Sequence, residues 1–138
     1  MPRVAAVAAV RVWINGLTTL VGPGRPLALG AHRTRLRSPG QGAYALIYRV
    51  GGISDLIAEE PVDRARVGAL IYAGTDEAAE TAAVAYANTV EGLSGTPAVM
   101  GDATCLVADD ITGPLLVDHS NTDLDQFVYS VDADFYLI

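Results

Sequence analysis

The residues best placed to do chemistry in this chain are two carboxylates near its C-terminus. Asp132 and Asp134 stand two positions apart, so in a strand both side chains would lie side by side on one face. Neighbouring carboxylates can act as an acid/base pair or hold a metal ion. The sequence ties no histidine, cysteine or oxyanion donor to this pair. We therefore expect Asp132 and Asp134 to line a polar sheet face or to meet arginines of a neighbouring subunit.

Three arginines with the same two-residue spacing form a second row. Arg33, Arg35 and Arg37 fall in a predicted strand and would project from one of its faces. Three interpretations are open: a solvated strand face, contacts with carboxylates of a neighbouring subunit, or contacts with phosphate groups. The functional hypothesis is a subunit interface that includes these arginines together with Asp132 and Asp134.

Weaker candidates for metal or nucleophilic chemistry lack the partners that such chemistry needs. Asn121, Asp123 and Asp125 resemble the first three ligand positions of a calcium loop, but the loop glycine and the terminal glutamate are missing. The remaining candidates are isolated in the sequence: His32, His119 and Cys105. Two separate histidines are too few for a metal cluster, and a cysteine in an apolar run is typical of a buried small side chain. We predict no catalytic residue, no metal site and no cofactor, and hence a protein that is not an enzyme.

The charges of the chain are divided sharply between its two parts. All nine basic residues are arginines within residues 1–66, where four acidic residues accompany them, giving +5. Residues 67–138 carry twelve carboxylates and no basic residue, so this part is −12 and the whole chain −7. A chain polarised in this way can associate with a copy of itself head to tail. The acidic sum argues against a dedicated nucleic-acid-binding protein, which would normally be basic.

Length and composition predict a single globular domain spanning residues 1–138. The apolar fraction of 51% and the charged fraction of 18% are typical of a folded chain, and a single cysteine suits a reducing compartment. The apolar run that begins at Val4 is interrupted at Arg11, so we expect an amphipathic helix rather than a signal peptide. No stretch approaches the roughly 20 apolar residues of a membrane span, so no membrane partner is expected.

The periodicity of apolar residues predicts an α+β fold with the element order α-β-β-β-α-β-β. The predicted helices are 2–21 and 76–93, and the predicted strands are 25–37, 43–50, 64–73, 103–108 with a resumption at 115–118, and 126–137. Thr75 is the expected N-cap of the second helix, whose alanines would let it approach a sheet closely. Short connections favour antiparallel pairing. We expect a mostly antiparallel sheet of four to six strands flanked by two helices.

Four local phrases accompany this order of elements: Ala43–Leu46 (AYAL), Ala69–Gly74 (ALIYAG), Ala82–Asn88 (AAVAYAN) and Val131–Leu137 (VDADFYL). Together, the order and the phrases resemble the tail terminator family of long-tailed bacteriophages, in the versions found in phages of actinobacteria. The resemblance spans nearly the whole chain. The all-arginine composition, rich in alanine, glycine and valine, also suits a genome of high GC content.

The resemblance implies a structural protein of the virion rather than an enzyme. It implies a hexameric ring in the neck region that caps the tail tube, stops its elongation and contacts the head-completion proteins, after assembly in the host cytoplasm. DNA would pass through the central channel without specific binding, and acidic walls would not retard it. We expect the loops 38–42 and 51–63 to contact the tail tube protein or the neck. The alternatives are a head-closure or head–tail connector subunit, or a small-ligand-binding domain.

Overall fold

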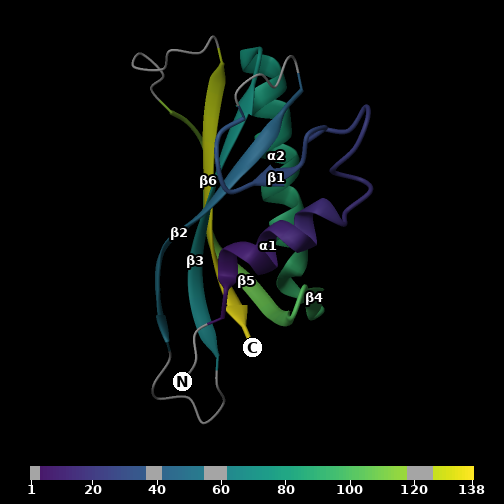
Figure 1. Ribbon diagram of the computed structural model, residues 1–138. Coiled ribbons are helices and arrows are strands. Elements are labelled where there is room, and N and C mark those ends of the chain that lie inside the picture. The colour runs from purple at the N-terminus through teal and green to yellow at the C-terminus, as the bar shows by residue number, and fades with distance from the viewer. Residues whose placement is uncertain (1–3, 37–41, 55–61, 118–125) are drawn as a thin grey trace.

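The computed structural model describes residues 4–36, 42–54, 62–117 and 126–138, and in it two α-helices pack on a six-stranded sheet (Figure 1). The elements in chain order are α1 (Ala6–Asn15), β1 (Ala31–His32), β2 (Tyr44–Ser54), β3 (Asp63–Ala73), α2 (Asp76–Glu91), the 3₁₀ turn η1 (Gly92–Ser94), β4 (Ala98–Met100), β5 (Ala103–Leu116) and β6 (Phe127–Leu137). The strand order across the sheet is β1-β2-β3-β6-β5-β4.

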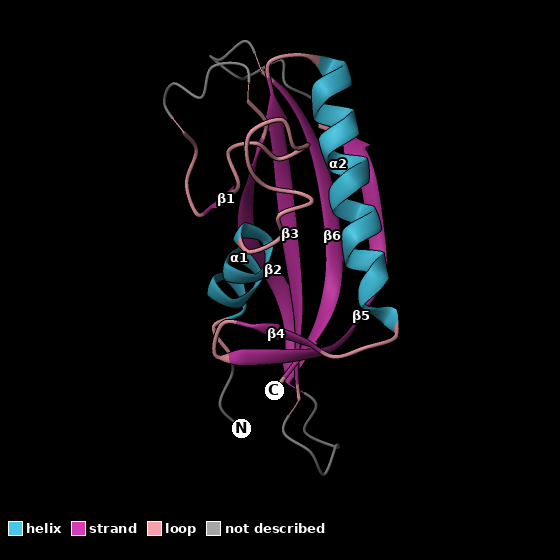
Figure 2. Ribbon diagram, turned by 90° about the vertical axis from the view of Figure 1, so that its right-hand side faces the viewer, coloured by secondary structure: helices cyan, strands magenta, loops and turns pink. Residues whose placement is uncertain are grey.

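The sheet is mixed, and both helices cover the same face of it (Figure 2). Every neighbouring pair of strands is antiparallel except β1 and β2, which are parallel. The predicted α+β fold, with a mostly antiparallel sheet and two flanking helices, is therefore confirmed. The parallel β1–β2 pair corrects the expectation of antiparallel pairing among the first strands.

Helix α1 is shorter than the sequence pattern indicates. The prediction was a helix over 2–21, but the helix ends at Asn15, and the following residues to Leu20 form turns. Leu17 and Leu20 still contribute to the core, since Leu20 is buried and Leu17 packs against the core cluster. These inward-facing leucines continue the apolar spacing of the helix, and that is why periodicity alone extended the helix too far.

Strand β1 is reduced to two residues where the sequence predicts a strand over 25–37. The side chain of Asn15 holds it in place: the Asn15 amide donates to the Ala31 carbonyl at 3.1 Å and its oxygen accepts from the Ala31 N–H at 2.8 Å. Gly30 precedes the strand with φ +77°, and a Cβ there would lie 2.6 Å from the Asn15 oxygen. Only glycine fits both the backbone conformation and the close approach.

Helix α2 begins at the predicted residue and has the predicted cap, and it ends at Glu91, two residues before the predicted end. The Thr75 hydroxyl accepts from the Ala78 N–H at 3.1 Å, as an N-cap residue does. The buried residues of the helix are Ala79, Ala82, Ala83, Tyr86, Ala87 and Val90. The Tyr129 hydroxyl of β6 donates to the Asp76 carboxylate at 2.6 Å, so the first turn of the helix is fixed to the centre of the sheet.

Strand β6 has nearly the predicted range 126–137, and the strands around it depart from prediction in detail. Phe127 and the alternate residues after it as far as Leu137 face the helices. Strand β5 is one continuous element rather than two, although its pairing with β6 contains three register shifts. The three-residue strand β4 was not predicted. Part of the expected loop 51–63 belongs to β2 and β3, and the rest of it lies outside the described residues.

Because α2 packs closely on the sheet, we expect the free energy of unfolding to depend strongly on side-chain size at the buried alanines of the helix. Ala82 is fully buried and Thr81 beside it is exposed. We expect Ala82→Leu to lower the free energy of unfolding by about 1–3 kcal/mol, because the added atoms must separate two packed layers. The matched control Thr81→Leu should change it by about 0.5 kcal/mol or less. Urea unfolding followed by circular dichroism measures both, and equal effects would contradict the layer contact.

Candidate functional site

The sheet face turned away from the helices carries an aromatic cluster near one end. Tyr44 of β2 and Tyr72 of β3 stack with ring centroids 5.0 Å apart, and Val128 of β6 packs beside them. Four partly buried side chains pack against this group: Leu36, Leu46, Leu70 and Val117. The cluster buries part of a face that no helix covers.

Asp134 forms the charged centre of the same sheet face. Its carboxylate accepts hydrogen bonds from Arg64 at 2.9 Å and from Arg66 at 3.2 Å, although the residue itself is only 5% exposed. Arg66 stands directly opposite Asp134 in the β3–β6 pairing and also reaches the Asp110 carboxylate at 3.2 Å. Hydrogen bonding to Asp134 raises the pKa of the Arg64 guanidinium above its usual value. The interaction satisfies a buried carboxylate with two cations of the same chain.

Asp132 lies next to this cluster, beside the side chain of Tyr48. A Cβ on Gly68 would lie 2.5 Å from Cζ of Tyr48 and 2.7 Å from Oδ1 of Asp132, so the phenol and the carboxylate both lie against the bare glycine. This Asp132 oxygen is buried and has no hydrogen-bond partner among the described residues. Burial first, and then the Asp132 charge, raise the pKa of the Tyr48 phenol.

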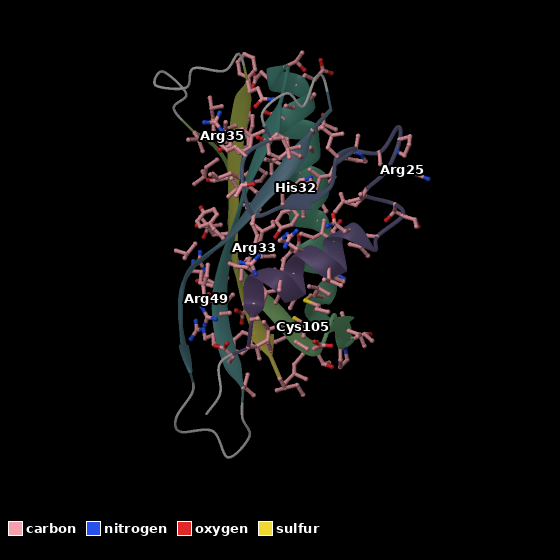
Figure 3. All side chains as sticks on the ribbon, viewed as in Figure 1. Arg25, His32, Arg33, Arg35, Arg49 and Cys105 are labelled. Atoms are coloured by element: carbon pink, nitrogen blue, oxygen red, sulfur yellow. The ribbon has the colours of Figure 1, made fainter. Side chains whose placement is uncertain are left out.

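The structure places the predicted arginine row outside regular strand structure. Arg33 and Arg35 follow β1 in an irregular, exposed segment, so they do not form the strand-face row that the alternation predicts, and Arg37 lies outside the described residues. The Arg35 guanidinium lies over the Tyr72 ring, 5.1 Å from its centroid, and Figure 3 labels the positions of Arg33 and Arg35. Neither arginine pairs with Asp132 or Asp134 within the chain. Their contact with a neighbouring subunit stays a prediction.

The sequence interpretation missed the arginines that do form ion pairs. Arg49 binds Asp63 at 2.9 Å, and Asp63 also accepts from the Val4 N–H at 2.9 Å, which anchors the chain before α1. Arg64 and Arg66 have the same two-residue spacing as Asp132 and Asp134. Matching that spacing across two predicted strands was the one signal that could have indicated a cross-strand pair of charges.

A groove of about 460 Å³ lies between α2 and β5. Val84, Asn88 and Glu91 line it from the helix, and Ile111 and Pro114 line it from the strand. Strand β4 pairs only with the first three residues of β5, so the rest of β5 has no further strand beside it in the part of the chain that the structure describes. The groove therefore lies at the opposite side of the sheet from β1 (Figure 2).

The described residues offer little for metal or nucleophilic chemistry. They contain no group of three or more histidine, cysteine or carboxylate side chains that could hold a metal ion. Burial raises the pKa of the Cys105 thiol to about 11, so the thiolate that a nucleophile needs is scarce at neutral pH. His32 contacts the Leu29 carbonyl at 2.6 Å. His119 and the calcium-loop candidate Asn121–Asp125 lie outside the described residues. Among the described residues, no helix has the length and apolar character to cross a membrane.

Comparison with known proteins adds no relative. No protein-family model matches the chain, and no curated protein matches it.

The burial of Asp134 predicts that two acidic partners of Arg66 contribute unequally to stability. We expect Asp134→Ala to lower the free energy of unfolding by about 2 kcal/mol, because it leaves two guanidinium groups without their shared buried acceptor. Asp110→Asn removes the charge of a carboxylate whose side chain is 69% exposed and keeps a residue type that tolerates φ 50°, and it should cost less than about 1 kcal/mol. Urea unfolding of the two variants measures the difference. An equal cost would show that Asp134 is not the centre of the cluster.

Proposed function

We propose that this protein is a structural virion component, a tail terminator whose copies form a ring on the last ring of the tail tube. The ring ends tube elongation and joins the tail to the head-completion proteins in the neck, after assembly in the host cytoplasm. DNA passes through its channel without specific binding. The protein has no catalytic role in this proposal. The hexameric stoichiometry follows from the family resemblance alone.

The observation that carries the proposal is the unlike charge at the two sides of the sheet. Arg33 and Arg35 follow β1 at one side of the sheet. Both are exposed, and neither has a carboxylate partner among the described residues. Carboxylates, with Glu91 and Asp109 among them, lie along α2 and β5 at the other side. A closed ring needs two different patches on each subunit that complement one another. This chain presents such a pair.

The same observation also fits the alternative, a head-closure or head–tail connector subunit, because these proteins also assemble around the path of the DNA. The local phrases favour the terminator. They lie in β2, β3, α2 and β6 and the residues adjoining these elements, so the resemblance concerns the framework of the fold and not a single loop. The net charge of −7 suits the wall of a channel through which a polyanion must pass.

Removing the protein from a phage that encodes it tests the assignment. Particles assembled without it should contain tail tubes of uncontrolled length, because nothing caps the growing end, and negative-stain electron microscopy measures the length distribution. The wild-type gene supplied in trans should restore a single length.

Two other results would redirect the assignment. Tails of normal length that fail to join heads would indicate a connector or head-closure subunit. Normal, infectious particles would contradict a structural role in the virion altogether.

A further inference from the structure

Glu91, Asp109 and Asp110 line the groove between α2 and β5, and of these only Asp110 forms an ion pair among the described residues, with Arg66; the groove therefore keeps a negative character. It lies near the C-terminal end of α2, where the last backbone carbonyls carry partial negative charge. The last turn of this helix contains no basic residue, and Glu91 adds a full negative charge there. Asn88 lines the same wall. A cation placed here gains from the helix end and from the carboxylate together.

The groove also has an apolar floor that suits the stem of a long side chain. Val84 is 42% exposed, and it lines the groove with Ile111 and Pro114. Arginine combines an aliphatic stem with a guanidinium head that binds carboxylates in bidentate geometry. The apolar lining and the negative charge of the groove therefore suit an arginine side chain.

Such an arginine is present in the same chain, on the other side of the molecule. Arg33 is exposed and forms no ion pair with any carboxylate in the described ranges. It follows β1, which is the edge strand at the end of the sheet opposite to β4 and β5. A groove at one side and its ligand at the other cannot meet within one molecule, but they can meet between successive copies.

We infer that the α2–β5 groove binds the segment 33–36 of a second copy of this chain, with the Arg33 guanidinium against Glu91. The inference rests on the self-association in the proposed function and names the surface that carries it. It also replaces Asp134 as the expected acidic partner, since that carboxylate is already bound by Arg64 and Arg66. The contact is heterologous, so each copy offers one groove and one segment, and the chain of contacts continues until it closes.

Charge reversal with rescue tests the contact. Arg33→Glu and Glu91→Arg should each weaken self-association by about tenfold or more, as the loss of a close interfacial charge pair does. The double variant Arg33→Glu/Glu91→Arg restores opposite charges and should regain most of the lost affinity. Sedimentation velocity at low ionic strength measures all three, and the wild-type association should weaken as salt is added.

Matched controls separate this contact from a general effect of charge. Arg25→Glu removes another exposed arginine, and Asp102→Arg reverses an exposed carboxylate in the turn between β4 and β5; both should leave association within about twofold of wild type. Glu91→Arg places a favourable charge at the helix C-terminus, so its effect on association cannot be attributed to unfolding. Single reversals without effect, a double variant that is no better than either single one, or a wild-type chain that stays monomeric would each overturn the inference.

Chemical cross-linking tests the direction of the contact. In a Cys105→Ala background, Thr34→Cys and Asn88→Cys in one chain leave Arg33 and Glu91 in place and should give a ladder beyond the dimer with a short bis-maleimide, because a head-to-tail contact repeats. Products that stop at the dimer would contradict it.

The two proposals fail in different ways. Rings that form normally despite charge reversal would refute this contact and leave the terminator role standing. Normal tails without the protein would refute the role even where the contact exists.

Discussion

One constraint shapes this molecule: two helices must be buried on a single face of a six-stranded sheet. Helix α2 meets that requirement with alanines, which allow its backbone to approach the strands beneath it. The strands present small side chains in return. The core contains buried alanines from both layers, among them Ala79, Ala82 and Ala83 of the helix and Ala69 and Ala133 of the sheet. Larger side chains such as Tyr86 and Phe135 fill the same core.

One-sided coverage leaves the other face of the sheet to be satisfied by its own side chains. At one end Tyr44 and Tyr72 stack and bury apolar area. Towards the other end Arg64 and Arg66 bind the buried Asp134. Strong electrostatic contacts are concentrated there because a buried carboxylate without partners would cost several kcal/mol. Arg64 and Arg66 of the basic part thus meet Asp110 and Asp134 of the acidic part inside the fold, and only the arginines outside these pairs are available to other molecules.

Elements with a strong periodic signal were predictable, and elements determined by distant contacts were not. Helix α2 and strand β6 each repeat their apolar residues over many positions, so their bounds follow closely from the sequence. The alternation at 33–37 indicates a strand equally well, yet β1 ends at His32, because the Asn15 side chain and the conformation of Gly30 determine where the chain can run. These are contacts between residues far apart in sequence, which a local pattern does not contain.

The same limit applies to the charged residues. The sequence indicated that arginines and carboxylates at two-residue spacing would matter, but it could not show which pairs meet. Arg66 and Asp134 meet because β3 and β6 are neighbours although the whole of α2 and β5 lies between them in the chain. Register between strands that are not consecutive in the chain is a property of the fold. The spacing alone made Arg33 as plausible a partner for Asp134 as Arg66.

The irregularity of β5 affects the tendency of the protein to aggregate at high concentration. An exposed strand edge is a template for indiscriminate pairing with other chains. The long edge of β5 is poorly suited to that, since Asp110 adopts φ 50° and Gly113 φ 105°, and the strand shifts register three times. These kinks interrupt the straight row of backbone donors and acceptors that an amyloid-like stack requires, and the carboxylates of Asp109 and Asp110 repel identical strands. The edge resists aggregation while the side chains around it remain available for recognition.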